Sequence, residues 1–247
     1  MFKKLLAAVG IGGTKVNTIV KPTPLFPGSP LEGEVHVQGG EVAQELEGLT
    51  VRLMTEVEVE VGDQEHRQGH VLAEWRLPAA GRIDPGHLIR VPFRVELPWE
   101  TPVTVIPGLT RSAKVWLKTG LAIDDAVDAG DRDELRIQPT PAMVAVIRAM
   151  EAAGFRPMRG DVEKGTLRGS GFSSTVGCYQ ELEFRPSGAG MGWRFKEIEL
   201  SFIARPNQLH LLLEVDRTFG GDSLRSFSFP ANVDAQTVSR QLNSVLR

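Results

Sequence analysis

The alternation of hydrophobic and polar side chains predicts that this chain is built mainly from short β-strands. The clearest run is Leu49–Val61, in which apolar residues fill most odd positions and charged residues most even positions. Ile89–Leu97 and Ala113–Leu117 repeat this period. Because every second side chain of a strand points to the same side, each run has one face for a core and one for water. Further strands are predicted at 16–20, 31–37, 71–77, 182–184, 198–202, 209–215 and 227–229.

Breaks in this alternation suggest how the strands are connected. Gly62–Gly69 is polar and is interpreted as a hairpin loop. Pro98–Arg111 contains three prolines, which lack the N–H that a sheet requires, so a long exposed loop is predicted there. The acidic segment 124–134 is interpreted as a linker. We therefore predict a mainly β fold of two β-sandwich domains, 1–137 and 138–247, with short N-terminal, central and C-terminal helices.

Helical spacing appears at three places. Thr140 is a suitable N-cap and Pro141 a suitable first residue for a helix over 141–153, and 233–246 forms an amphipathic helix at the end of the chain. Residues 2–9 are predicted to form a short helix that either packs on the domain or contacts a partner or membrane surface. The candidate partner contacts in it are Phe2, Lys3, Lys4 and Leu5.

Composition narrows the classes of function. The net charge of −3, with both signs interspersed, argues against nucleic acid as a partner. One cysteine, Cys178, allows no internal disulfide, so we expect a cytoplasmic protein. The N-terminal apolar run lacks a small-residue cleavage site and is not interpreted as a signal peptide. No apolar segment approaches the roughly 20 residues that span a bilayer, and a membrane contact would be weak.

No combination of residues predicts catalysis, a cofactor or a metal site. His66 and His70 are four residues apart but lie in a predicted loop and strand start, and the acidic segment lacks the spacing of a calcium loop. The glycine-rich stretch 188–192 is interpreted as a hairpin loop, and Cys178 as a packed side chain. Asp216 and Arg217 form a charge pair at a strand end and are a candidate interdomain contact.

Several segments together resemble the SpoOM-type sporulation-control family, and the resemblance covers almost the whole chain. They are Phe2–Leu6 with Gly10–Gly12, Leu53–Glu56, Val91–Pro102, Lys114–Leu121, Pro139–Pro141, Gly154–Phe155 and Leu213–Arg217. The resemblance implies arrestin-like β-sandwich domains, no catalytic activity and a role as a regulator or scaffold that acts through protein contacts.

Two alternatives stay open at this level. One is a peripheral membrane-surface binder that uses the N-terminal helix, and the other is an unrecognised metal-binding hydrolase. Trp99 is interpreted as a cover for the core, with a partner contact as its second interpretation. The sequence specifies neither the partner's identity nor the oligomeric state.

Overall fold

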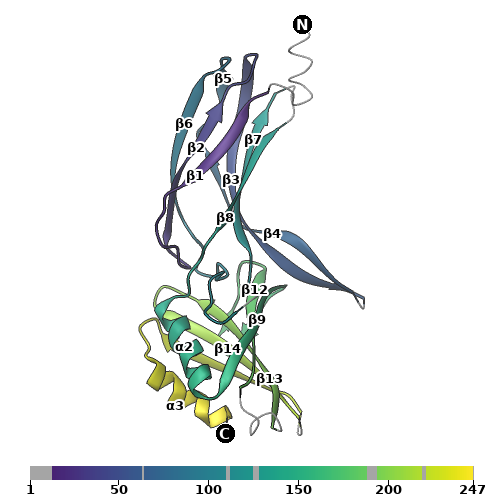
Figure 1. Ribbon diagram of the computed structural model, residues 1–247, viewed down its shortest axis with the longest axis vertical. Helices are drawn as coiled ribbons and strands as arrows, with labels where there is room; N and C mark the ends of the chain where they lie inside the picture. The colour runs from purple at the N-terminus through teal and green to yellow at the C-terminus, as the bar shows by residue number, and fades with distance from the viewer. Residues whose placement is uncertain are drawn as a thin grey trace.

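The computed structural model describes residues 13–62, 64–109, 112–124, 128–187, 194–218 and 221–246. The predicted helix over 2–9 and the glycine-rich stretch 188–192 lie outside these residues. We call residues 13–137 the first half and residues 138–246 the second half. In Figure 1 the first half occupies the upper part of the view and the second half the lower part.

The first half is a sandwich of two facing β-layers. A sheet in the order β1-β2-β6 forms one layer, and β3, β4, β5, β7 and β8 form the other. Thr18 of β1 reaches across to the second layer, where its hydroxyl lies 2.6 Å from that of Thr119. The strands are β1 (Lys15–Val20), β2 (Pro30–Gln38), β3 (Gln44–Val61), β4 (Gln64–Leu77), β5 (Gly81–Ile83), β6 (Leu88–Glu96), β7 (Val115–Ile123) and β8 (Ala129–Leu135).

The second half is an antiparallel sheet in the order β15-β14-β13-β12-β9, with helices α2 and α3 packed together on one side (Figure 1). Leu167, just before the small ribbon of β10 and β11, and Phe172 of β11 join a separate apolar cluster with Ile203 and Leu212. This half thus differs from the predicted second sandwich, because helices cover the sheet where a second sheet was expected. The elements are α2 (Pro141–Ala152), β9 (Phe155–Lys164), β10 (Arg168–Gly169), β11 (Phe172–Ser173), β12 (Cys178–Pro186), β13 (Phe195–Ala204), β14 (Gln208–Arg217), β15 (Ser223–Pro230) and α3 (Ala235–Leu246).

One sheet runs through both halves. Strand β3 of the first half pairs in parallel with β9 of the second half at Glu58 and Glu163. The full order is β15-β14-β13-β12-β9-β3-β7-β8, with β4 and β5 on the other side of β3. The side chains on one side of this sheet therefore form a surface that continues from the first half to the second.

The mainly β fold is confirmed, and so are several local features. Helix α2 begins at Pro141, and the Met143 N–H donates to the Thr140 hydroxyl at 3.4 Å, as an N-cap should. Strands β13 and β14 form the predicted hairpin. The apolar odd positions of β3, from Leu49 to Val57, are buried where they were expected to face a core. The domain boundary after residue 137 stays a prediction.

Two connections were predicted wrongly. The acidic segment is not a linker, because Ala129–Leu135 is strand β8 and pairs with β7. The interpreted hairpin loop is mostly strand as well, since β4 begins at Gln64 and pairs with β3 as far as the turn. In both segments the side chains are polar on both faces, and a strand of that kind lacks the alternation by which strands are recognised.

Candidate functional site

The junction between the two halves brings together polar side chains from distant parts of the chain. The loop that begins at Pro98 lies buried there. Thr101, Val103 and Ile106 are 2%, 0% and 5% exposed. The N–H of Val103 donates to the Gln180 side chain at 2.8 Å, and that side chain donates to the Val103 carbonyl at 2.9 Å.

The prediction of an exposed loop here was therefore wrong. Prolines break a strand, but they also remove N–H groups that would need partners inside the protein, so a proline-rich loop is easier to bury than other loops. Because Gln180 satisfies the backbone of Val103, the loop can act as a wedge between the halves.

Glu100 fixes this loop to the second half. Its side chain is 6% exposed. The carboxylate accepts hydrogen bonds from the N–H and hydroxyl of Thr175, at 2.9 and 2.6 Å, and from Arg205 at 2.6 Å. A buried carboxylate is stable only with such partners. Glu100 is thus a clamp between the halves.

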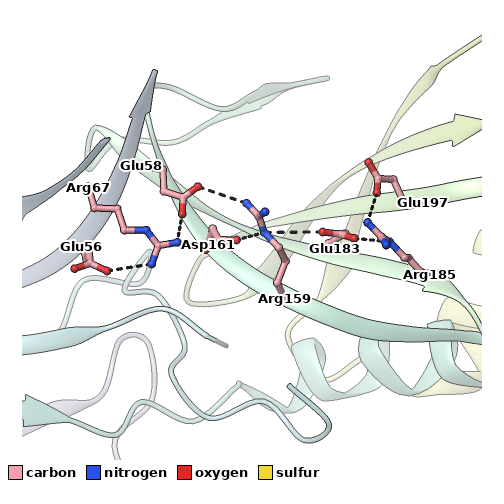
Figure 2. A network of polar contacts seen from close by, with 8 residues as sticks. All are labelled: Glu56, Glu58, Arg67, Arg159, Asp161, Glu183, Arg185 and Glu197. Carbon is pink, nitrogen blue, oxygen red and sulfur yellow. Dashed lines mark hydrogen bonds and ion pairs between the residues drawn. The ribbon is translucent and has the colours of Figure 1, made fainter. Parts of the chain in front are cut away.

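A second cluster lies where β3 meets β9, and Figure 2 shows it as a chain of ion pairs. Glu58 of β3, with a side chain 8% exposed, contacts Arg67 of β4 and lies 3.4 Å from Arg159 of β9. Both arginines also pair with Asp161. The chain continues through Glu183, Arg185 and Glu197 of the second half.

Sequence reasoning missed Glu58. Its even position in β3 predicts a solvent-facing side chain, yet the residue is 7% exposed. The arginine from β9 that bonds to it is 101 residues away in the chain, and no local pattern indicates a contact over that separation.

A cleft of about 450 Å³ opens beside this cluster, with walls from both halves. Its polar side chains are largely engaged with one another: Lys114 pairs with Glu56 at 3.1 Å, and the Ser112 hydroxyl donates to the Thr104 carbonyl at 2.6 Å. Neither histidine nor cysteine is among the described residues of the wall. The arrangement can hold the two halves together, because the hydroxyls and charged groups of the described wall are used in contacts with one another.

The predicted site residues occupy separate places. Trp99 is partly buried against the main core. A Cβ on Gly28 would lie 2.4 Å from its ring, so Gly28 makes room for it. This packing agrees with the interpretation of Trp99 as a cover, and its role as a partner contact stays a prediction. Phe2, Lys3, Lys4 and Leu5 lie outside the described residues.

Asp216 and Arg217 make contacts within the second half. Asp216 lies 3.2 Å from Lys196. Arg217 donates to the Ser223 hydroxyl at 2.9 Å and to the Val245 carbonyl at 3.2 Å. These contacts do not join the two halves. They therefore do not include the interdomain contact that we predicted because the pair lies at a strand end.

Cys178 is packed, as predicted, with 1% exposure. Burial, with the nearby negative charge of Glu100, raises the pKa of its thiol to about 12, so the reactive thiolate is disfavoured. Among the residues that the structure describes, no group of three or more His, Cys, Asp or Glu side chains is arranged to hold a metal ion. No described helix is long and apolar enough to cross a membrane.

Comparison with known proteins places the chain in a family. The model of a family described as SpoOM protein matches residues 2–219. The sporulation-control protein spo0M of Bacillus subtilis (strain 168) is 33% identical over 220 residues, which cover 89% of this chain and 82% of that protein. The crystal structure of Spo0M from Bacillus subtilis superimposes with a TM-score of 0.84 at 28% identity, over 96% of this chain and 98% of that one. The chain therefore belongs to the SpoOM family of sporulation-control proteins.

Proposed function

We propose that this protein is a non-enzymatic regulatory adaptor that acts through protein–protein contacts, and that strand β4 is the edge on which a partner docks. The observation that carries the proposal is the length and exposure of this edge. Strand β4 has 14 residues, and its pairing within the described residues is with β3. Residues 64–69 are exposed, and Val71 is an exposed apolar side chain at 44%.

An open strand edge is a template for a further strand. Its unpaired N–H and C=O groups can bond to an extended segment of another chain, and the neighbouring side chains select which segment binds. Natural proteins usually protect such an edge when it has no partner. Because β4 combines an open edge with an exposed valine, an extended partner segment with an apolar side chain facing Val71 fits it best.

The charged groups of the junction support a role without catalysis. Glu58, Arg67, Arg159 and Glu100 are engaged with one another or with neighbouring residues across the two halves. A catalytic base or acid needs a free position from which it can reach a substrate. The junction is better suited to hold β4 at a fixed angle to the second half than to carry out a reaction.

Photocrosslinking in living cells tests this proposal. A photoreactive amino acid placed at Val71 should capture the same protein in independent replicates. The substitution Val71→Lys in a chain with the photoreactive group at Gln68 should abolish that capture, since an edge lysine opposes strand addition. Leu88→Lys is the matched control, because Leu88 is similarly exposed at 40% but lies on β6. Equal loss with both substitutions, or no reproducible crosslink, would contradict docking on β4.

A further inference from the structure

Two carboxylates of strand β8 lie on the inner side of the sandwich in the first half. Asp131 and Asp133 are in register with Thr119 and Leu117 of β7, which are 1% and 0% exposed. Residues in register share a side of the sheet, so both carboxylates lie on the core side of β8. A carboxylate in such a place needs hydrogen-bond donors or a cation close to it.

The two carboxylates differ in their donors. One oxygen of Asp131 accepts the N–H of Thr18 on β1 at 2.6 Å, and the other accepts the N–H of Arg132 at 2.8 Å. The Oδ2 atom of Asp133 is buried and has no hydrogen-bond partner among the described residues. Two ionised carboxylates cannot donate to each other, whereas a protonated Asp133 has an O–H that can donate to Asp131.

Within the described part of the chain, no ion pair joins Asp133 to a cation. The residues of β7 in register with the two carboxylates are uncharged, and so is Thr18 on β1. Arg132 and Glu134 alternate to the opposite side of β8. Asp131 is therefore the charged group that faces Asp133. Burial, and then the negative charge of Asp131 and the hydrogen bond between the two carboxyl groups, raises the pKa of Asp133 to about 6.

The two carboxylates lie at the seam where β1 closes the sandwich. Strand β8 is the last strand of the continuous sheet, and β1 is an edge strand of the other layer. The described residues of β1 and β8 pack together without a backbone ladder, since β1 pairs with β2 and β8 pairs with β7. Thr18 connects them instead: its N–H donates to Asp131, and its hydroxyl lies 2.6 Å from that of Thr119. Strand β1 thus closes the sandwich beside the free edge of β8.

We propose that Asp131 and Asp133 form a proton-dependent latch that holds β1 against β8. While Asp133 is protonated, it donates to Asp131, and Asp131 accepts the Thr18 N–H. When Asp133 loses its proton, the two carboxylates repel each other, and the carboxylate that holds β1 is displaced. Strand β1 then separates from β8 in a larger fraction of molecules, and the free edge of β8 becomes accessible to a further strand. This inference goes beyond docking on β4, and either could fail without the other.

The direction of the pH dependence follows from the pKa of Asp133. This pKa is about 6 in the closed latch, and we take the ordinary value of 3.8 for the open latch. Protonation therefore favours the closed latch. Its contribution is complete when the pH is below 3.8 and is lost as the pH rises through about 6. The fraction of molecules with an open latch should increase about tenfold between about pH 5 and about pH 7.

Amide hydrogen exchange at Thr18, measured by NMR on the full chain, tests the latch directly, because this N–H is the group that Asp131 holds. The protection factor of Thr18, which corrects for the ordinary pH dependence of exchange, should fall about tenfold from about pH 5 to about pH 7. Asp133→Asn keeps a donor beside Asp131 and has no proton to lose, so its Thr18 protection should not fall. A pH-independent protection in the original chain, or the same fall in Asp133→Asn, would overturn the inference.

Two further variants and one internal control complete the test. Asp131→Asn can still accept the Thr18 N–H but removes the repulsion, so the fall should also disappear there, even if Asp133→Asn does not fold. Glu134→Gln removes a charge from the outer side of β8, where the side chain is 77% exposed, and should keep the fall. The Val103 N–H, which donates to Gln180, should respond to pH alike in all chains. If Glu134→Gln abolishes the fall, or if Val103 changes together with Thr18, the latch is wrong.

Discussion

The junction and the acidic face use the same kind of side chain in opposite ways. At the junction, Glu58 is flanked by Arg67 and Arg159, and Glu100 meets Arg205. The acidic face is formed by Glu163, Glu181, Glu199 and Glu214 on the side of the second-half sheet opposite α2, and in it Glu199 lies between Glu183 and Glu214. The first arrangement stabilises the fold through paired charge, and the second destabilises it through repulsion.

The largest effect is expected at Glu100. Glu100→Ala removes the carboxylate that accepts from Thr175 and pairs with Arg205 at the wedge between the halves. We expect a loss of about 2–4 kcal/mol in the free energy of unfolding, measured by urea denaturation. Glu96→Ala, at an exposed position of β6, is the control and should change the free energy of unfolding by about 0.5 kcal/mol or less. Similar losses of stability in both variants would contradict the role of Glu100 in holding the two halves together.

Trp99→Ala should have the next largest effect. The ring packs over Gly28 and against the main core, and truncating a partly buried aromatic side chain should cost about 2–3 kcal/mol. The thermal midpoint should fall while the crosslink from position 71 persists. An unchanged midpoint together with a lost crosslink would instead make Trp99 a partner contact.

The acidic face should make stability depend on pH. The pKa of Glu181 is raised from 4.5 to about 8, and that of Glu163 from 4.5 to about 6. A group with a higher pKa in the folded state stabilises the fold while it is protonated. Its contribution to stability is complete when the pH is below the pKa that the group has in the unfolded state. That contribution is lost as the pH rises through the pKa of the group in the folded state. For Glu181 this window runs from pH 4.5 to about 8.

The thermal midpoint should therefore fall as the pH is raised from about 5 to about 9. The midpoint of the Glu181→Gln variant should fall less over that range. Differential scanning calorimetry at several pH values measures both curves. Glu96→Gln is the control, and its curve should follow that of the original chain. A Glu181→Gln curve parallel to the original would mean that Glu181 ionises as an ordinary surface carboxylate.

Periodicity in the sequence predicts the elements that have one apolar face. Strand β3, the β13–β14 hairpin and the capped start of α2 are examples, since local chemistry alone specifies them. Strand β8 is missed because its sequence, AGDRDEL, ends in its one large apolar side chain, Leu135. Strand β9 is missed because Pro157 and Gly160 interrupt its alternation.

The junction could not be predicted in the same way. Glu58 and Arg159 are 101 residues apart in the chain, and Glu100 and Arg205 are 105 apart. Each of these residues, taken alone, resembles an ordinary surface charge. The contacts depend on the pairing of β3 with β9 and on the burial of the loop after Pro98, and both are properties of the assembled fold.

The most direct test of the account compares one carboxylate from each region. Glu58→Gln and Glu199→Gln each remove one negative charge and keep the size of the side chain. At neutral pH, we expect Glu58→Gln to lower the free energy of unfolding by about 1–2 kcal/mol, because it removes the buried charge that Arg67 and Arg159 share. Glu199→Gln should raise it by up to about 1 kcal/mol, because it relieves repulsion across the strands. Changes of the same sign in both variants would contradict the distinction between paired and unpaired charge.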